Sequence, residues 1–301
     1  MTTLAEHEIY RLESKQDYLN NRDAQSDALD WRQALWDARR SIIRFLRASN
    51  FLFDVAGALQ KSGYHSFPMR HFLAPPISQD QFKLLCDEWS KSSEKSGTTL
   101  TLAKSAAVAK VFGERRSKHL TAWIDRSRSP RLAELASAIG AIAPLMANQQ
   151  VATARRNRFA AMQENAVLDT LADRGWTRLQ SGSVVTAGQL PAKHFMHKTR
   201  FASGVAQTQE VDVACGLGST VVLALECKVT NDETNSVKRI DDVLKKAQAW
   251  KNHWGSFVKP AALLQGVIKA SEVQRLLDGG VEVFWSHRLD LFNQWIDANE
   301  S

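Results

Sequence analysis

The chain has 301 residues, of which 44% are hydrophobic and 24% charged, and its formal net charge at pH 7 is +7. This composition is typical of a folded protein of one or two domains, and it excludes wholesale disorder, collagen-like repeats and coiled-coil bias. No stretch is apolar for long enough to span a membrane, and the first eight residues lack the basic start and apolar block of a signal peptide. Cys86, Cys215 and Cys227 are too few and too scattered for a disulfide framework. We therefore expect a cytoplasmic protein with reduced cysteines and no membrane association.

The first half of the chain is predicted to be almost entirely helical. From residue 26 to residue 46, apolar side chains recur near the 3.6-residue period of a helix, with arginines between them. Further helices are predicted over 51–59, 79–92, 100–125 and 130–150. Three prolines between residues 67 and 76 predict a loop there. We therefore expect residues 1–150 to form an all-α region.

Most of the excess positive charge lies within this helical half. Eight basic residues but only two acidic ones lie between residues 101 and 131. Such a concentration is typical of a surface that binds a polyanion such as DNA, although a basic charge balance can also serve solubility alone. The residues that we assign to DNA contact here are Lys104, Lys110, Arg115, Arg116 and Lys118. A helix-turn-helix over 102–124 is a second alternative, with loose spacing.

The pattern changes to alternating helices and strands after residue 155. A strongly amphipathic helix is predicted over 158–174 and is closed by Gly175. Strands are then predicted over 176–185, 209–214, 220–229, 261–268 and 281–285, with helices over 234–254, 271–278 and 289–298. Strands followed by crossover helices indicate a mixed α/β sheet in residues 151–301.

The residues suited to catalysis lie at the ends of two predicted strands. Asp212 ends one strand, and Glu226 and Lys228 end the next. Residues two apart on a strand share a face, so Glu226 and Lys228 project together. Two carboxylates suit Mg²⁺, and an ammonium beside them can position an attacking water. Taken alone, Glu-x-Lys is more often a surface charge pair, but the apolar run 220–225 places these charges at the end of a buried strand, where they need partners or a metal.

These residues resemble the PD-(D/E)XK nuclease superfamily. The match consists of Asp212, Glu226-Cys227-Lys228 and a preceding helix that contains Glu164, and Val211 stands where the superfamily's proline would be. Two longer runs, 226–239 and 283–290, together with Lys246 and Trp250, resemble type II restriction endonucleases of the XamI group. The first resemblance covers residue 155 to the C-terminus, and the second extends over the whole chain.

The resemblance implies a restriction-endonuclease-like α/β core, a mixed sheet flanked by helices, that follows an all-α N-terminal region. It also implies a type II site-specific deoxyribonuclease, which uses Mg²⁺ to hydrolyse phosphodiester bonds of double-stranded DNA. Asp212, Glu226 and the backbone carbonyl of Cys227 would bind the metal, and Lys228 would orient the water. Glu164 would be the upstream acidic residue, with Asp169 and Glu210 as alternatives.

The same resemblance implies partners beyond the substrate. A homodimer would match a palindromic site, and a cognate DNA methyltransferase would complete the system. The helical region 1–150 would then bind DNA or mediate dimerisation. Four further residues are predicted to contact DNA phosphates: Arg155, Arg156, Lys238 and Arg239. A repair- or phage-type nuclease of the same fold and a catalytically inactive DNA-binding protein are the alternatives.

Overall fold

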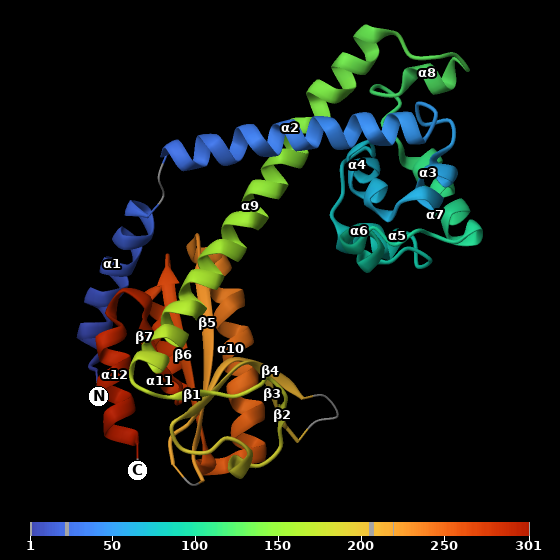
Figure 1. The fold of residues 1–301 in the computed structure, drawn as a ribbon. Helices are drawn as coiled ribbons and strands as arrows, with labels where there is room; N and C mark the ends of the chain where they lie inside the picture. The colour runs from blue at the N-terminus through green and yellow to red at the C-terminus, as the bar shows by residue number, and fades with distance from the viewer. Residues whose placement is uncertain (1, 22–23, 205–207, 219, 301) are drawn as a thin grey trace. The chain divides into compact units, whose positions relative to one another are not determined.

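A computed structural model of the chain describes residues 2–21, 24–204, 208–218 and 220–300 (Figure 1). The chain divides into two compact units, one of Met1–Asp23 and Arg155–Ser301 and the other of Ala24–Ala154. We call them the α/β unit and the helical unit. The predicted division between residues 150 and 151 lies close to the observed one, but the first helix, α1 (Leu4–Asn20), belongs to the α/β unit.

The helical unit is built around the long helix α2 (Ala24–Ala48). Its core includes Phe45 and Phe72, together with the fully buried indoles of Trp89 and Trp123. Each indole N–H has a partner, because Trp89 Nε1 donates to the Ser66 hydroxyl and Trp123 Nε1 donates to a main-chain carbonyl. The remaining helices are α3 (Val55–Lys61), α4 (Ser66–His71), α5 (Gln79–Leu85), α6 (Lys91–Ser96), α7 (Leu102–Arg115), α8 (Ala122–Asp125) and the first part of α9 (Leu132–Asp173).

Several predicted boundaries in this half are wrong, for local reasons. The predicted loop 67–76 begins with helix α4, which accommodates Pro68 in its first turn, where a helix needs no amide donor. The predicted helix 100–125 is interrupted between Arg115 and Ala122, and α8 has only four residues, too few for the recognition helix of a helix-turn-helix. The helices predicted over 130–150 and 158–174 are one helix, α9, because no glycine or proline separates them.

The α/β unit contains the predicted mixed sheet flanked by helices. The strands run in the order β1-β3-β4-β5-β6-β7, with β2 also paired to β3. Strands β3, β4 and β5 are antiparallel, whereas β5, β6 and β7 are parallel. The strands are β1 (Thr177–Arg178), β2 (Ser183–Val184), β3 (His194–Phe201), β4 (Gln209–Gly216), β5 (Val222–Thr230), β6 (Val258–Gly266) and β7 (Glu282–Trp285). The sequence did not predict β3, whose basic residues hide its alternating pattern.

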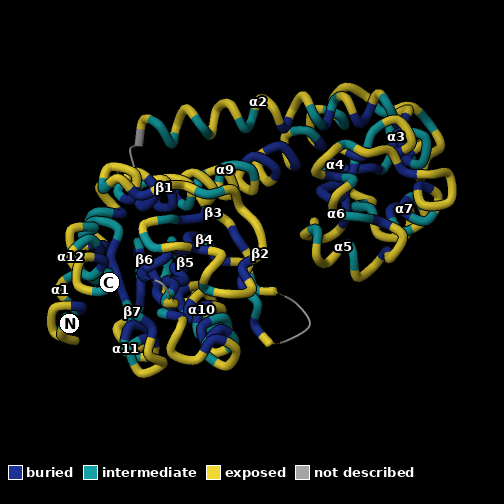
Figure 2. The backbone as a smooth tube through the Cα atoms, turned by 60° about the horizontal axis from the view of Figure 1, so that its bottom comes forward, coloured by how far each residue is buried: buried dark blue, intermediate teal, exposed yellow. Residues whose placement is uncertain are grey.

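Helices cover both faces of this sheet, and strands β4, β5 and β6 between them are mostly buried (Figure 2). The end of α9 and α12 (Leu289–Asn299) pack on one face, through a cluster that includes Leu171, Val213, Leu225 and Phe292. The other face packs against α10 (Glu233–Trp254) and α11 (Ala270–Asp278). Single 3-10 turns lie at Gly63–His65, Ala187–Gln189, Gly255–Phe257 and Ser286–Arg288.

Helix α1 packs at the β6–β7 side of the sheet. The Ser14 hydroxyl accepts the Gly266 amide at 3.0 Å, and Arg11 donates to the Ile268 carbonyl at 3.1 Å. His7 accepts the indole N–H of Trp285 at 3.2 Å. These contacts join the start of the chain to strands that lie more than 200 residues later. Over the described ranges, none of the helices has the length and apolarity to cross a membrane.

Candidate active site

The candidate site lies where the sheet loses its regular hydrogen bonding. The β3–β4 ladder pairs His197 with Val213 and Thr199 with Val211 but omits the intervening pair, Lys198 and Asp212. Lys198 has a left-handed φ of 51°, a conformation that is uncommon for a residue other than glycine. The β4–β5 ladder also covers only Val213 to Gly216 of β4, so it begins one residue after Asp212. Asp212 therefore sits at a local break in both ladders.

This break changes which way the strand faces. Val213 packs in the cluster under α9 and α12, whereas Val211, only two residues earlier, packs in the cluster under α10. In a regular strand both side chains would point to the same face. An irregularity of this kind redirects a side chain, as β-bulges do near active sites. Here the redirected residue is Asp212, whose carboxylate accepts the backbone N–H of Cys227 on β5 at 2.8 Å.

Three predicted catalytic residues meet at this point. Lys228 Nζ lies 2.6 Å from Glu226 Oε2 and 3.4 Å from Asp212 Oδ2. Glu226 is completely buried, and the side chains of Asp212 and Lys228 are each 13% exposed. The hairpin of β4 and β5 thus brings the two carboxylates to one ammonium, as the sequence pattern predicted.

Burial and charge act in opposite directions on these groups. Burial raises the pKa of Glu226, and the ammonium groups of Lys228 and Lys246 oppose that rise. Burial also acts to lower the pKa of Lys228, but the negative charges of Glu226 and Asp212 outweigh it and hold this pKa above its ordinary value. Lys228 therefore remains an ammonium at neutral pH.

A second lysine, Lys246 on α10, also reaches the site. Its Nζ lies 2.8 and 2.9 Å from the two carboxylate oxygens of Glu226 and 2.8 Å from the Glu210 carbonyl. Sequence reasoning assigned it no role, because no local pattern links residue 246 to residue 226. One signal was available: Lys246 directly precedes Ala247, a member of the buried face of α10 that packs on the sheet.

Glu164 on α9 is buried and binds two residues of β3. Its Oε2 lies 2.7 Å from His197 Nε2 and 3.2 Å from Lys198 Nζ. Asp169 and Glu210, the two alternatives for the upstream acidic residue, are exposed.

The Cys227 thiol lies between Glu226 and Lys228 in sequence but is not suited to be a nucleophile. Burial raises its pKa well above the ordinary value, and the nearby negative charges of Asp212 and, next in size, Glu164 raise it further. Cys227 therefore stays a neutral thiol.

The donor set at the site suits Mg²⁺ better than zinc. In the described part of the chain, three or more His, Cys, Asp or Glu side chains nowhere gather as a metal-binding group. Asp212 and Glu226 offer carboxylate oxygens only, and Mg²⁺ is commonly held by one or two carboxylates with water and substrate phosphate completing its shell. The nearest histidine contact, that of His197, is made with Glu164.

The predicted DNA-contacting residues fall into two groups. In the helical unit, Lys104, Lys110, Arg115 and Lys118 are exposed. Arg116 is instead engaged by the Asp125 carboxylate and donates to the Thr121 hydroxyl at 2.7 Å, so its guanidinium is committed within the fold. In the α/β unit, Lys238 and Arg239 are exposed near the start of α10, and Arg155 and Arg156 lie on α9.

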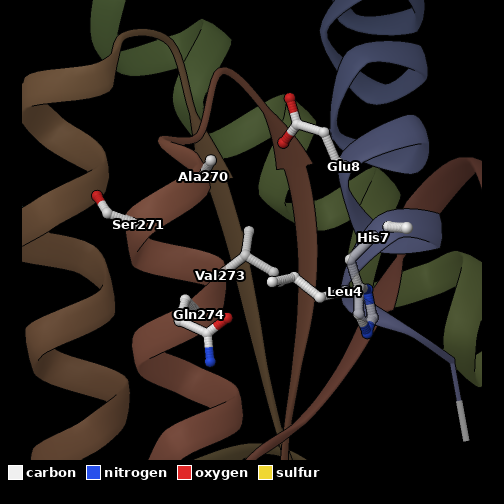
Figure 3. Close-up of a pocket in the computed structure, with 8 residues that line it drawn as sticks. Leu4, His7, Glu8, Ala270, Ser271, Val273 and Gln274 are labelled. Atoms are coloured by element: carbon white, nitrogen blue, oxygen red, sulfur yellow. The ribbon is translucent and has the colours of Figure 1, made fainter.

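A separate pocket lies between α1 and α11 (Figure 3). Leu4 points toward Val273 across it, and His7 and Glu8 stand at its α1 side. No predicted site residue lines this pocket, and Glu8 is paired with Arg11 at 2.6 Å. The pocket is therefore distinct from the carboxylate cluster.

Comparison with known proteins identifies the family of this chain. Residues 50–285 match the family model of the XamI restriction endonuclease. The type II restriction enzyme XamI of Xanthomonas campestris pv. amaranthicola is 31% identical over 193 residues, which cover 62% of this chain and 67% of that protein. Among solved structures, protein VC1899 from Vibrio cholerae aligns with 90% of this chain and 56% of its own, at 12% identity and a TM-score of 0.31.

The family match covers most of the helical unit and most of the α/β unit that contains the mixed sheet. The chain belongs to the XamI restriction endonuclease family and is a type II restriction endonuclease. The family, the α/β fold with a mixed sheet and the activity class predicted from the sequence are thereby confirmed. As a restriction enzyme, it binds DNA.

Proposed function

We propose that this enzyme hydrolyses phosphodiester bonds of double-stranded DNA with Mg²⁺ held by Asp212 and Glu226. The proposal is supported by one observation: the carboxylates of Asp212 and Glu226 both accept hydrogen bonds from Lys228 at the break in the sheet. The Cys227 carbonyl is the third proposed ligand. Its amide faces Asp212, and the amide and carbonyl of a strand residue point to the same side. Mg²⁺, when bound, supplies Lewis-acid polarisation of the scissile phosphate.

Each protein group then has a distinct task. Lys228, held as an ammonium, donates hydrogen bonds that orient the attacking water and stabilise the negative charge that develops on the phosphate. Glu164 acts as the upstream acidic residue, and its bonds to His197 and Lys198 fix the irregular part of β3 opposite Asp212. Lys238 and Arg239 contact the DNA backbone beside the site, because their exposed ammonium and guanidinium groups lie on the helix that follows β5.

We further propose that the exposed basic residues of the helical unit supply DNA affinity, with dimerisation as the alternative role for this unit. We also propose that the enzyme acts as a homodimer on a palindromic site and has a cognate methyltransferase as its system partner, a proposal that its family membership supports. We place the enzyme in the cytoplasm, where its DNA substrate and the methyltransferase would be found. Sedimentation analysis tests the dimer, and protection of plasmid from cells that carry the methyltransferase tests the pairing.

Plasmid cleavage tests the catalytic assignment. With Mg²⁺, the wild-type enzyme is expected to give discrete fragments, and Asp212→Ala and Lys228→Ala to lose cleavage by on the order of 10³-fold. Asp173→Asn is the matched control, since Asp173 is an exposed carboxylate on the same helix as Glu164 and has no assigned role. Wild-type rates in both site variants would refute the assignment. Binding without cutting by the wild type would indicate an inactive DNA-binding protein, and unspecific degradation would indicate a repair-type nuclease.

A further inference from the structure

The unusual feature of the site is that two lysines bind one fully buried carboxylate. Glu226 accepts a 2.6 Å bond from Lys228 and 2.8 and 2.9 Å bonds from Lys246. Lys228 comes from the same strand, and Lys246 comes from a different element, α10. The Nζ atom of Lys246 contacts both oxygens of the Glu226 carboxylate, so it occupies a position from which a metal cation could also bind this carboxylate.

The charges of the cluster balance without a metal. Asp212 and Glu226 carry two negative charges, and Lys228 and Lys246 carry two positive ones. Binding of a divalent cation would leave this buried site with a net charge of +2, which is costly in a poorly solvated environment. One of the two ammonium groups therefore has to withdraw from Glu226 when the metal enters.

Lys246 is better placed than Lys228 to withdraw. Its side chain is 23% exposed, compared with 13% for Lys228, and Lys228 is also bonded to Asp212. Lys246 already has another acceptor, because its Nζ lies 2.8 Å from the Glu210 carbonyl. A lysine ammonium is a compact charge on a flexible stem and can exchange partners, unlike the rigid fork of an arginine.

Resting on the proposed function, we infer that Lys246 is a positioning residue that occupies the metal-binding side of Glu226 in the metal-free enzyme. Its two hydrogen bonds hold the buried carboxylate in place, and its charge competes with an incoming divalent cation. When the cation binds, Lys246 keeps its bond to the Glu210 carbonyl and releases Glu226.

Metal titration of the full-length protein without DNA tests this inference. Binding of Ca²⁺ and of Mg²⁺ is measured by calorimetry for the wild type, Lys246→Met and Lys246→Arg. Lys246→Met is expected to bind both ions about tenfold more tightly, since it removes a competing charge within 3 Å of Glu226. Lys246→Arg keeps the charge but can hold the carboxylate as a bidentate fork that exchanges poorly, and it is expected to bind both ions more weakly than the wild type. Lys245→Met, which alters an adjacent exposed lysine, is the matched control and should leave metal affinity unchanged.

Thermal unfolding separates this role from a purely structural one. In EDTA, Lys246→Met should unfold at a lower temperature than the wild type, and saturating Ca²⁺ should restore most of the difference. If Lys246 only supports the fold, Lys246→Met will bind metal with unchanged or weaker affinity, and this result overturns the inference. Circular dichroism confirms folding, and Lys246→Gln replaces Lys246→Met if the latter does not fold. Failure of the wild type itself to bind either ion would overturn the proposed function as well.

Discussion

The two units of this enzyme each bury an ion cluster, and the clusters are built differently. In the helical unit, Arg70 and Glu94 form two parallel bonds of 2.6 and 2.8 Å, with side-chain exposures of 0% and 6%. Gln79 donates to the same carboxylate, and the remaining Arg70 nitrogen donates to the Ile77 carbonyl. The pair is rigid and fully partnered, and it fixes the segment between α4 and α6.

In the α/β unit, the buried carboxylate is bound by lysine ammonium groups and not by an arginine. Glu226 has two lysine partners from different elements, and Asp212 contributes its Oδ2 both to Lys228 and to a backbone amide. An arginine fork matches a carboxylate bidentately, whereas lysines are point charges that can be exchanged. The difference indicates that the first cluster serves stability and that the second is suited to exchange a cation.

Loss of the rigid cluster should have the largest effect. Arg70→Met leaves Glu94 buried without its countercharge, and we expect the free energy of unfolding to fall by about 3–5 kcal/mol. Urea unfolding followed by tryptophan fluorescence measures this change. The double variant Arg70→Met/Glu94→Leu should recover much of the loss, because it removes both charges. A loss of under about 1 kcal/mol in the single variant would contradict the assignment.

A substitution in the carboxylate–lysine cluster of the α/β unit should change metal affinity more than stability. Glu226→Gln is expected to weaken Mg²⁺ binding by more than about 100-fold, since even partners in the outer shell of a metal site contribute about 10–100-fold. Its unfolding free energy without metal should fall by less than that of Arg70→Met, because Lys228 and Lys246 are partly exposed and can turn to water. Calorimetry and urea unfolding measure the two quantities. Equal losses of stability in both variants would remove the distinction between the clusters.

Surface charges of the helical unit should act on DNA binding alone. Lys104→Gln and Lys110→Gln are each expected to reduce the slope of log affinity against log salt by about 0.9 if the side chain contacts a phosphate. Arg116→Gln should leave the slope unchanged, because Arg116 is bound by Asp125 and Thr121. Fluorescence anisotropy with Ca²⁺ in place of Mg²⁺ measures binding without cleavage. An unchanged slope in both lysine variants would show that Lys104 and Lys110 do not contact DNA phosphates.

The smallest expected effect concerns a half-buried ion pair near the start of α9. Hydrogen bonds from Arg128 and from the Arg131 amide lower the pKa of Glu134 from 4.5 to about 2. Since the folded-state pKa is depressed, its stabilisation is present above pH 4.5 and is lost as the pH falls through about 2. Glu134→Gln should therefore melt below the wild type at pH 6, with the difference vanishing near pH 2. A difference in melting temperature that does not depend on pH would contradict this account.

The sequence predicted the parts of the site that depend on local patterns. The apolar run before Glu226 and the two-residue spacing to Lys228 placed both side chains on one face of a buried strand, and the structure shows them 2.6 Å apart. The redirection of Asp212 was not predictable, because it depends on a break in two ladders and on the left-handed Lys198. Lys246 was missed because its contact with Glu226 joins residues that are twenty positions apart on different elements.

The same limit explains the other differences. Strand β3 was not predicted, because exposed Lys198 and Arg200 alternate with buried residues that belong to different clusters on either side of the break. Arg116 was assigned to DNA on the charge of its segment, yet it pairs with Asp125, nine residues away. Charge totals predict that a surface is basic, but the tertiary structure decides which of its residues remain available.

The packing of α1 has a practical consequence for how the enzyme is shortened. The segment that matches the family, residues 50–285, excludes both α1 and α12. A protein trimmed to that segment would lose the hydroxyl that binds the Gly266 amide and the Phe292 side chain that packs under the sheet. It would expose apolar surface on the α9 face of the sheet and leave the Trp285 indole without its His7 partner. Production of a stable nuclease core therefore requires both ends of the chain, including the first helix that precedes the helical unit.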